Sequence, residues 1–138
     1  MKYKNPKVGV GILIFNDKNQ LLVIQRNNKK SEGKGSWSPP GGYVDWGEHF
    51  FDAARREALE ETGLKVKDVE LFSVTNDMLL SYHSITIWVK SHSNGTKISI
   101  DKDEVADYVW CEINNPPTPM FEPFRQLLMT KEWRTKIR

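Results

Sequence analysis

Three glutamates, Glu57, Glu60 and Glu61, lie close together in a segment with the composition of a helix. At about 100° per residue, their spacing places the three carboxylates on one narrow arc of that helix. Like charges at these spacings repel each other by roughly 0.2–0.5 kcal/mol per pair, so helix stability alone does not explain the cluster. Carboxylate oxygens are the ligands that a hard divalent cation such as Mg2+ or Mn2+ prefers.

The three glutamates by themselves leave two interpretations open. An apolar stripe that begins at Phe51 runs beside their arc, which would place a bound cation at a half-buried margin of the helix. Glutamate-rich helix faces are also common on protein surfaces, and Asp52, Arg56 and Glu60 follow each other at the four-residue spacing of an ordinary solvated ladder. The residues on either side of the cluster are therefore needed to decide.

The whole run from residue 42 to residue 64 fits the pattern G-x5-E-x7-R-E-U-x-E-E-x-G-U, where U is an apolar residue. Its fixed positions are Gly42, Glu48, Arg56, Glu57, Ala58, Glu60, Glu61, Gly63 and Leu64. This run resembles the Nudix box, so the chain is similar to the MutT-like group of Nudix hydrolases. A Pro-Gly-Gly turn before the helix, and the spacing of Glu104 and Trp110 after it, extend the resemblance from about Val8 to Leu128.

The resemblance implies a fold, a chemistry and a set of ligands. The fold would be an α/β/α sandwich around a mixed β-sheet. The family cleaves nucleoside diphosphates that are linked to another moiety, and it uses Mg2+ or Mn2+. The implied metal ligands are Glu57, Glu60 and Glu61, with the carbonyl of Gly41 as a further candidate.

Three charged residues are expected to support the metal site. Arg56 would orient Glu60 or another carboxylate of the box. Glu48 would support the site or the start of the helix, and a carboxylate at a helix N-terminus is also favoured by the helix dipole alone. Glu104 is a candidate for an additional metal ligand or a general base, although two neighbouring aspartates leave an ordinary acidic loop as the alternative.

The candidate substrate contacts are aromatic and basic residues outside the box. Nucleobases stack on flat rings, so Trp37 and Phe121 are the main candidates, with Phe72 and Trp88 also considered and the core as the alternative for most of them. Phe121 stands before the last helix, where MutT itself carries a base-reading asparagine, so we do not expect specificity for oxidised guanine. Arg26 is a candidate phosphate contact, with a solubilising loop charge as the alternative.

The elements that must position these residues follow from local patterns. Apolar runs, alternation and turn residues predict an α+β or mixed α/β fold. The predicted strands are 8–15, 20–25, 69–76, 84–91, 96–100 and 106–111, and the predicted helices are 49–62 and 121–133. The first two strands are expected to form a hairpin, Asn94-Gly95 is expected to close a second hairpin onto 96–100, and residues 27–36 are expected to form a loop.

Length and composition limit the class of protein. The 138 residues fit a single domain over 1–138. A net charge of +2 does not indicate a nucleic-acid polymer or a membrane as a partner. One cysteine excludes a disulfide framework and a cysteine-rich zinc site. The sequence contains neither an apolar segment long enough to span a membrane nor a signal-type N-terminus, so we expect a cytoplasmic protein.

Taken with the resemblance, these features favour hydrolysis of a nucleoside triphosphate, deoxy or modified, to the monophosphate and pyrophosphate. Cleavage of ADP-ribose or a nucleotide sugar is the alternative among enzymes, although such relatives often carry an additional N-terminal segment and few residues precede the first strand here. A nucleotide-sensing module without catalysis is a third alternative, although such proteins usually lose box glutamates that are present in this chain. The resemblance also favours a homodimer.

Overall fold

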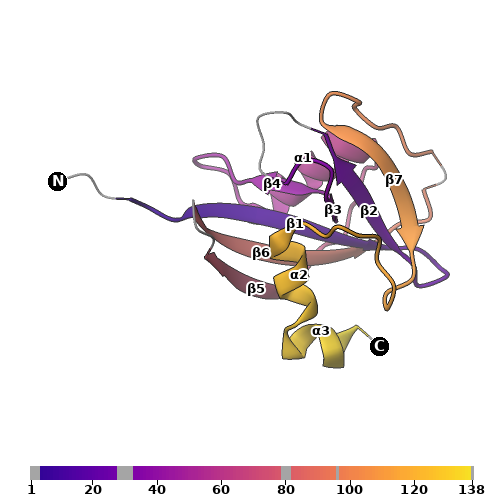
Figure 1. The fold of residues 1–138 in the computed structure, drawn as a ribbon. Helices are drawn as coiled ribbons and strands as arrows, with labels where there is room; N and C mark the ends of the chain where they lie inside the picture. The colour runs from indigo at the N-terminus through magenta and orange to yellow at the C-terminus, as the bar shows by residue number, and fades with distance from the viewer. Residues whose placement is uncertain (1–3, 28–32, 79–81, 96, 138) are drawn as a thin grey trace.

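The computed structural model describes residues 4–27, 33–78, 82–95 and 97–137. Its elements follow each other along the chain as Figure 1 shows. They are β1 (Lys7–Phe15), β2 (Leu21–Arg26), β3 (Trp37–Ser38), β4 (Gly41–Tyr43), α1 (Phe50–Thr62), β5 (Glu70–Met78), β6 (His83–His92), β7 (Val105–Cys111), α2 (Glu122–Leu128) and α3 (Lys131–Lys136).

Within the described ranges, seven strands form one mixed sheet with β1 at its centre. The order along the sheet is β3-β2-β1-β6-β5, while β4 also pairs with β1 and β7 with β2. β1 and β6 run parallel, and the other pairs are antiparallel. The prediction of a mixed sheet is confirmed.

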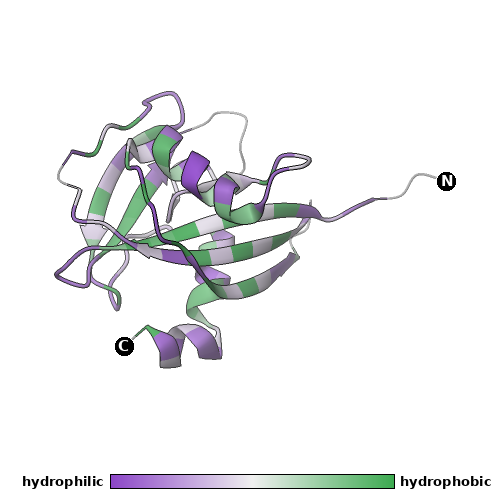
Figure 2. Cartoon of the chain, turned by 180° about the vertical axis from the view of Figure 1, so that it is seen from behind, coloured by the Kyte–Doolittle hydropathy of each residue, from purple (hydrophilic) through white to green (hydrophobic). Residues whose placement is uncertain are grey.

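Helices cover the two faces of this sheet. Ala53, Ala54 and Ala58 of α1 pack against one apolar cluster, and Phe124 of α2 and Trp133 of α3 pack against another. Figure 1 shows α1 on one side of the sheet and α2 with α3 on the other. In Figure 2 the central strands carry much of the apolar colour, whereas the connecting loops and α3 are largely hydrophilic. The arrangement is the expected α/β/α sandwich.

Elements with strong local signals form where the sequence predicts them. The opening hairpin is present, with Phe15 of β1 opposite Leu21 of β2. α1 begins after His49, whose ring Nδ1 accepts a hydrogen bond from the Phe51 N–H at 3.0 Å. It ends at Gly63, which has a φ of 75° and therefore needs the conformational freedom of glycine.

The second predicted hairpin is wrong. Residues 97–100 form no strand, and Thr96 lies outside the described residues. The segment crosses the C-terminal end of α1, where the Ser99 N–H donates to the Thr62 carbonyl at 2.8 Å. A tertiary hydrogen bond to the helix end has therefore replaced the local pairing that Asn94-Gly95 suggested.

The predicted helix 121–133 is divided into α2 and α3. Thr130 separates them, because its hydroxyl donates to the Leu127 carbonyl at 2.7 Å and accepts a hydrogen bond from the Trp133 N–H at 3.3 Å. Threonine competes in this way with the backbone bonds of a continuous helix and caps a new one.

Two short strands and the shape of a loop escaped the sequence analysis. β3 and β4 flank the Pro39-Pro40 turn and contain only two and three residues. In the predicted loop 27–36, residues 28–32 lie outside the described residues, and the described end closes through a hydrogen bond from the Gly35 N–H to the Arg26 carbonyl at 2.7 Å.

Candidate active site

The register of α1 separates the three clustered glutamates. Glu57 and Glu61 are buried, with 9% and 6% of their surface exposed, on the same face as the alanines that pack against the sheet. The side chain of Glu60 is 51% exposed. The prediction that all three carboxylates lie at one half-buried margin of the helix is therefore wrong. Two of them turn inward, beside the small alanines that pack on the sheet.

Arg56 holds the acidic residues around it in place. Its Nε and Nη2 donate to the two carboxylate oxygens of Glu48 at 2.8 and 3.0 Å, and its Nη1 donates to Glu57 at 2.9 Å. The Nη1 atom also lies 3.4 Å from a Glu60 oxygen, and Nη2 donates to the Tyr43 carbonyl at 3.1 Å. The planar guanidinium thus links the start of the box to its glutamates.

Burial sets the protonation of the two inward carboxylates. Burial and the neighbouring Glu57 raise the pKa of Glu61 to about 8, against a hydrogen bond that the Gly41 N–H donates at 2.8 Å. Burial also raises the pKa of Glu57, and Arg56 opposes that shift. By contrast, the hydrogen bonds from Arg56 lower the pKa of Glu48 to about 2. The positive groups around Glu57 and Glu61 therefore do not offset the effect of burial on their pKa values.

The glycines of β4 leave room for these carboxylates. A Cβ atom at Gly42 would lie 2.5 Å from an oxygen of Glu57, which is closer than real Cβ contacts allow. A Cβ atom at Gly41 would lie 2.2 Å from the Val10 carbonyl oxygen of β1. A side chain at position 41 would therefore meet backbone atoms, whereas one at position 42 would have to displace the carboxylate of Glu57.

A cavity of about 590 Å3 opens beside Glu57 and Glu61. This volume is within the range typical of small-molecule sites. Its walls come from β1, β3, β4, β6, α1, the end of β2, the start of α2 and the loops before β7 and α2. The predicted site residues that line it are Arg26, Gly41, Glu57, Glu61, Glu104 and Phe121.

Glu104 reaches the cavity from the turn before β7. Its backbone carbonyl accepts a hydrogen bond from the Asn27 N–H at 2.9 Å, which ties this turn to the end of β2. Its charge contributes to the raised pKa values of Glu57 and Glu61, so it lies within electrostatic range of both. Asp101 and Asp103, the competing acidic residues, do not line the cavity.

Arg26 and Phe121 form one end of the cavity. The Arg26 guanidinium carbon lies 4.3 Å from the centre of the Phe121 ring, which is a cation–π distance. The Arg26 Nε is buried and has no hydrogen-bond partner in the described part of the chain. A buried donor of this kind is costly to leave unpaired, so this end of the cavity suits an acceptor such as a phosphate oxygen.

The other aromatic candidates differ in their positions. Trp37 does not line the cavity; it packs against the core between the sheet and α2. Phe72 lies in the same core, where its ring meets the Trp133 ring edge to face at 6.3 Å. Trp88 is also buried but reaches the cavity, where its ring occupies the space above Gly11.

The acidic wall fits a divalent cation that is completed by other ligands. No group of three His, Cys, Asp or Glu side chains in the described ranges forms a complete metal site, and Glu60 is turned towards Arg56. The two buried carboxyl groups nevertheless share a cavity wall, and they form an all-oxygen donor set that becomes anionic when a cation replaces their protons. Mg2+ is commonly held by one or two carboxylates together with water and substrate phosphates.

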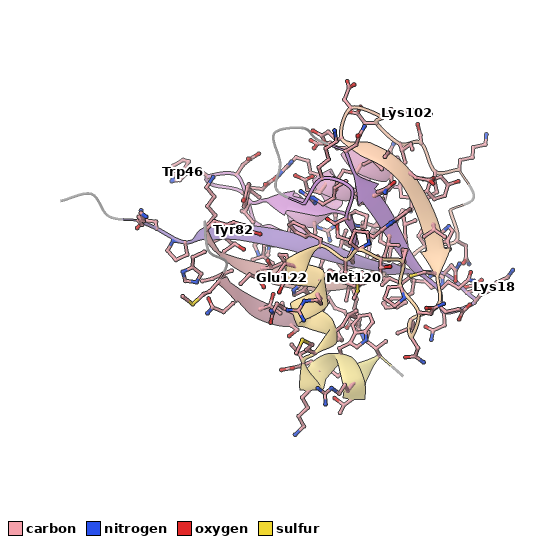
Figure 3. The ribbon with its side chains drawn as sticks, viewed as in Figure 1. Lys18, Trp46, Tyr82, Lys102, Met120 and Glu122 are labelled. Atoms are coloured by element: carbon pink, nitrogen blue, oxygen red, sulfur yellow. The ribbon has the colours of Figure 1, made fainter. Side chains whose placement is uncertain are left out.

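Sequence reasoning missed several residues of the cavity. Lys7 and Tyr43 lie at its rim, with the Lys7 Nζ 4.9 Å from the centre of the Tyr43 ring. Ser84 and Thr86 of β6 also line it, as does Tyr82 just before that strand, which Figure 3 labels. The alternation of β6 had put Ser84 and Thr86 on one face, but nothing local indicated that this face meets a cavity.

Within the described ranges, no helix is long and apolar enough to cross a bilayer.

Comparison with known sequences identifies related proteins. The family model of the NUDIX domain matches residues 5–131. An m7GpppN-mRNA hydrolase from Xenopus laevis is 30% identical over 121 residues, which cover 76% of this chain and 41% of the relative. Nudix hydrolase 6 from Arabidopsis thaliana is 40% identical over 68 residues, which cover 49% of this chain and 24% of the relative. The chain spans less than half the length of these curated relatives.

Solved structures show the same architecture. A MutT NUDIX hydrolase from Burkholderia pseudomallei superposes with a TM-score of 0.82 at 26% identity, covering 91% of this chain and 97% of that one. The NUDIX domain of Shewanella oneidensis NrtR, in complex with ADP ribose, has a TM-score of 0.79 at 20% identity and covers 99% and 91% of the two chains. This second likeness concerns the fold alone. With the family model matched over most of its length, and with the box residues on α1 and β4, the chain belongs to the Nudix family.

Proposed function

We propose that this protein is a Mg2+-dependent hydrolase of nucleoside diphosphate-linked substrates, most strongly a nucleoside or deoxynucleoside triphosphate that it converts to the monophosphate and pyrophosphate. The observation that carries the proposal is the pair of buried carboxylates, Glu57 and Glu61, on the wall of a cavity of nucleotide size. Burial favours the protonated forms of these two carboxyl groups, whereas their charged forms need a positive partner beside them. A cation with a phosphate chain supplies that partner.

Each residue of the site has a role in the proposed reaction. Glu57 and Glu61, with Glu60 and the carbonyl of Gly41, would hold Mg2+ or Mn2+. When bound, the ion would neutralise charge on the phosphates and lower the pKa of a coordinated water. Arg56 keeps Glu57 oriented through its 2.9 Å hydrogen bond.

Two further groups act on the substrate itself. Glu104 lies on the cavity wall, where its carboxylate would accept a proton from the attacking water. Arg26 would donate to phosphate oxygens, and the Phe121 ring would stack on the base. Arg26 and Phe121 are in contact, so phosphate and base would be recognised by one unit.

A product assay tests this proposal. The protein is incubated with Mg2+ and a panel of NTPs, dNTPs, ADP-ribose and nucleotide sugars, and the products are separated by chromatography. Monophosphate and pyrophosphate from a triphosphate are the expected products. Glu61→Gln and Glu60→Gln should lower this turnover by roughly 100-fold, the size expected for lost stabilisation of transition-state charge. Glu70→Gln, on an exposed ion pair with Lys90, is the matched control and should leave the rate unchanged.

Near-wild-type turnover by Glu61→Gln would contradict the metal assignment. Tight binding of a nucleotide without turnover of any substrate would instead favour the nucleotide-sensing alternative. Products from ADP-ribose or a nucleotide sugar alone would favour the second enzymatic alternative.

Capped RNA is a further candidate substrate. The Xenopus laevis m7GpppN-mRNA hydrolase aligns with 76% of this chain, and a Pelagibacter ubique RNA pyrophosphohydrolase is 42% identical over 74 residues. The expected absence of nucleic-acid partners therefore needs a test, and a capped dinucleotide and a 5′-triphosphorylated RNA belong in the panel. The single domain over 1–138, the homodimer and the cytoplasmic location stay predictions.

A further inference from the structure

Polar side chains occupy a buried patch of the sheet where apolar residues are expected. The patch lies on the face that also carries Trp88, and its members are only 1–9% exposed. They come from facing positions of β5 and β6, in the pairs Asp77 with Ser84 and Thr75 with Thr86, followed by Ser73 opposite Trp88. Burial of polar groups on a sheet face is costly, so such a patch needs a compensating role.

Hydrogen bonds within the patch converge on one oxygen of Asp77. The Thr86 hydroxyl donates to Asp77 Oδ2 at 2.7 Å, and the Ser84 hydroxyl donates to the same atom at 3.3 Å. The second oxygen, Asp77 Oδ1, is buried and has no partner in the described part of the chain, and the residue as a whole is 1% exposed. A carboxylate only accepts, so it fixes the direction of both hydroxyl protons.

This arrangement determines what the cavity presents to a ligand. Ser84 and Thr86 line the cavity, whereas their protons are directed to Asp77. The hydroxyl oxygens therefore offer only lone pairs to a bound molecule. Gly9, which pairs with Thr86 across β1 and β6 and also lines the cavity, has no side chain to cover them.

We propose that Ser84 and Thr86, oriented by Asp77, select nucleobases that carry an exocyclic amino group over those that carry a carbonyl at the same place. The inference rests on the proposed function and names the substrate class within it. An amino group donates to the two hydroxyl oxygens, whereas a carbonyl meets lone pairs and leaves its own acceptor unpaired. Asp77 is a positioning residue, because it acts through the two hydroxyls.

A binding experiment tests the preference without relying on turnover. Affinities for the α,β-methylene analogues of CTP and UTP, which differ in their 4-amino or 4-carbonyl group and in the proton on the adjacent ring nitrogen, are measured by calorimetry with Mg2+ present. The analogues of ATP and ITP provide a second pair of the same kind. We expect the amino member of each pair to bind about tenfold more tightly or better, the size of one unsatisfied buried hydrogen bond. Equal affinities, or no measurable binding of any analogue, would overturn the proposal.

Two variants examine the hydroxyls and the carboxylate separately. Thr86→Val removes one hydroxyl at nearly constant shape, and Asp77→Asn introduces an amide that donates to the hydroxyls and turns their protons towards the cavity. Each should reduce the ratio of CTP-analogue to UTP-analogue affinity about fivefold or more. Ser73→Ala, in the same patch but outside the cavity lining, should keep the wild-type ratio. If Asp77→Asn does not fold, Thr86→Val decides, and a wild-type ratio in that variant would overturn the proposal.

Turnover separates this inference from the proposed function. Hydrolysis of triphosphates without the amino preference would overturn the inference alone. Amino-selective binding without hydrolysis of any substrate would overturn the proposed function and leave the selectivity supported.

Discussion

Arg56 links residues that lie far apart in the sequence of the Nudix box, and it orients the carboxylates of the box. Its guanidinium forms hydrogen bonds with both oxygens of Glu48 and with Glu57, and it approaches Glu60. A single side chain thereby orients the loop before α1 and the buried face of that helix. Its effect on catalysis should therefore depend on the geometry of its fork as well as on its charge.

Arg56→Lys tests this role, because lysine keeps the charge and loses the fork. We expect the turnover number at saturating Mg2+ and substrate to fall roughly 10- to 100-fold, as for the loss of a group that orients metal ligands. Steady-state pyrophosphate release measures it. Arg55→Lys is the matched control: Arg55 binds Asp52 and the Lys67 carbonyl on the exposed side of α1. Equal effects of the two substitutions would contradict the role of Arg56.

Glu61 makes the stability of the metal-free protein depend on pH. Burial raises its pKa to about 8, well above the ordinary value of a glutamate, so the folded state holds this proton more tightly than the unfolded state. The free energy of unfolding should therefore fall as the pH rises from about 4.5 to about 8, by an amount on the order of a few kcal/mol. The stabilising shift of Glu48, whose pKa is lowered to about 2, is lost only at lower pH.

Urea denaturation with a chelator at several pH values between 5 and 8 measures this dependence. Glu61→Gln is the comparison, and its stability should vary less with pH than that of the wild type. Added Mg2+ should also reduce the wild-type dependence, because the cation replaces the proton on the carboxylate. Parallel curves for the two proteins would show that Glu61 titrates normally.

At the scale of elements, α1 and β4 approach each other so closely that a side chain at the box glycine would have to displace a carboxylate of α1. A Cβ atom at Gly42 would lie 2.5 Å from the Glu57 carboxylate, and one at Gly41 would lie 2.2 Å from the backbone of β1. The two glycines therefore serve different contacts. One leaves space for a carboxylate, and the other allows strand pairing.

Gly42→Ala should displace Glu57 and lower turnover by at least about tenfold, since small displacements of reacting groups are costly. Gly41→Ala should instead lower the melting temperature, because its Cβ meets backbone atoms that cannot rotate away. Activity assays and thermal denaturation of both variants measure the two effects. A Gly42→Ala enzyme with unchanged turnover would show that Glu57 moves freely in the site.

The elements also show how far local sequence patterns reach. The strands around Val8–Phe15 and Ser84–Ser91 and the helix that ends at Gly63 were predicted correctly, because periodicity and capping are local signals. Residues 97–100 were predicted wrongly because the Thr62 carbonyl at the end of α1 captures the Ser99 N–H. A hydrogen bond between distant segments leaves no trace in the local pattern.

At the scale of the whole molecule, the cavity assembles segments from most of the chain. Lys7 of β1, Thr86 of β6, Glu104 before β7 and Phe121 before α2 all contribute to its lining. Trp46, the fully exposed tryptophan of the loop before α1, points away from the body of the molecule (Figure 3). The ring of Phe121 therefore belongs to the candidate site, whereas the ring of Trp46 lies outside it.

Phe121→Ala should raise the KM for nucleotide substrates by an amount equivalent to about 1–3 kcal/mol, the contribution of base stacking on an aromatic ring. Trp46→Ala is the matched control and should leave KM unchanged, because its ring lies outside the cavity lining. Steady-state kinetics with the best substrate of the panel measures both. An unchanged KM in Phe121→Ala would assign that ring to packing alone.

The sequence by itself determined the family, the helix α1 and the acidic character of its chemistry, because a fixed spacing of glycine, arginine and glutamates is a local property. Only the tertiary structure decided that Glu57 and Glu61 turn inward while Glu60 stays exposed, because the packing of α1 on the sheet sets the rotation of the helix. The same holds for Glu104 and for the patch around Asp77. Their places depend on strands that meet across the sheet, and sequence spacing does not encode which segments meet.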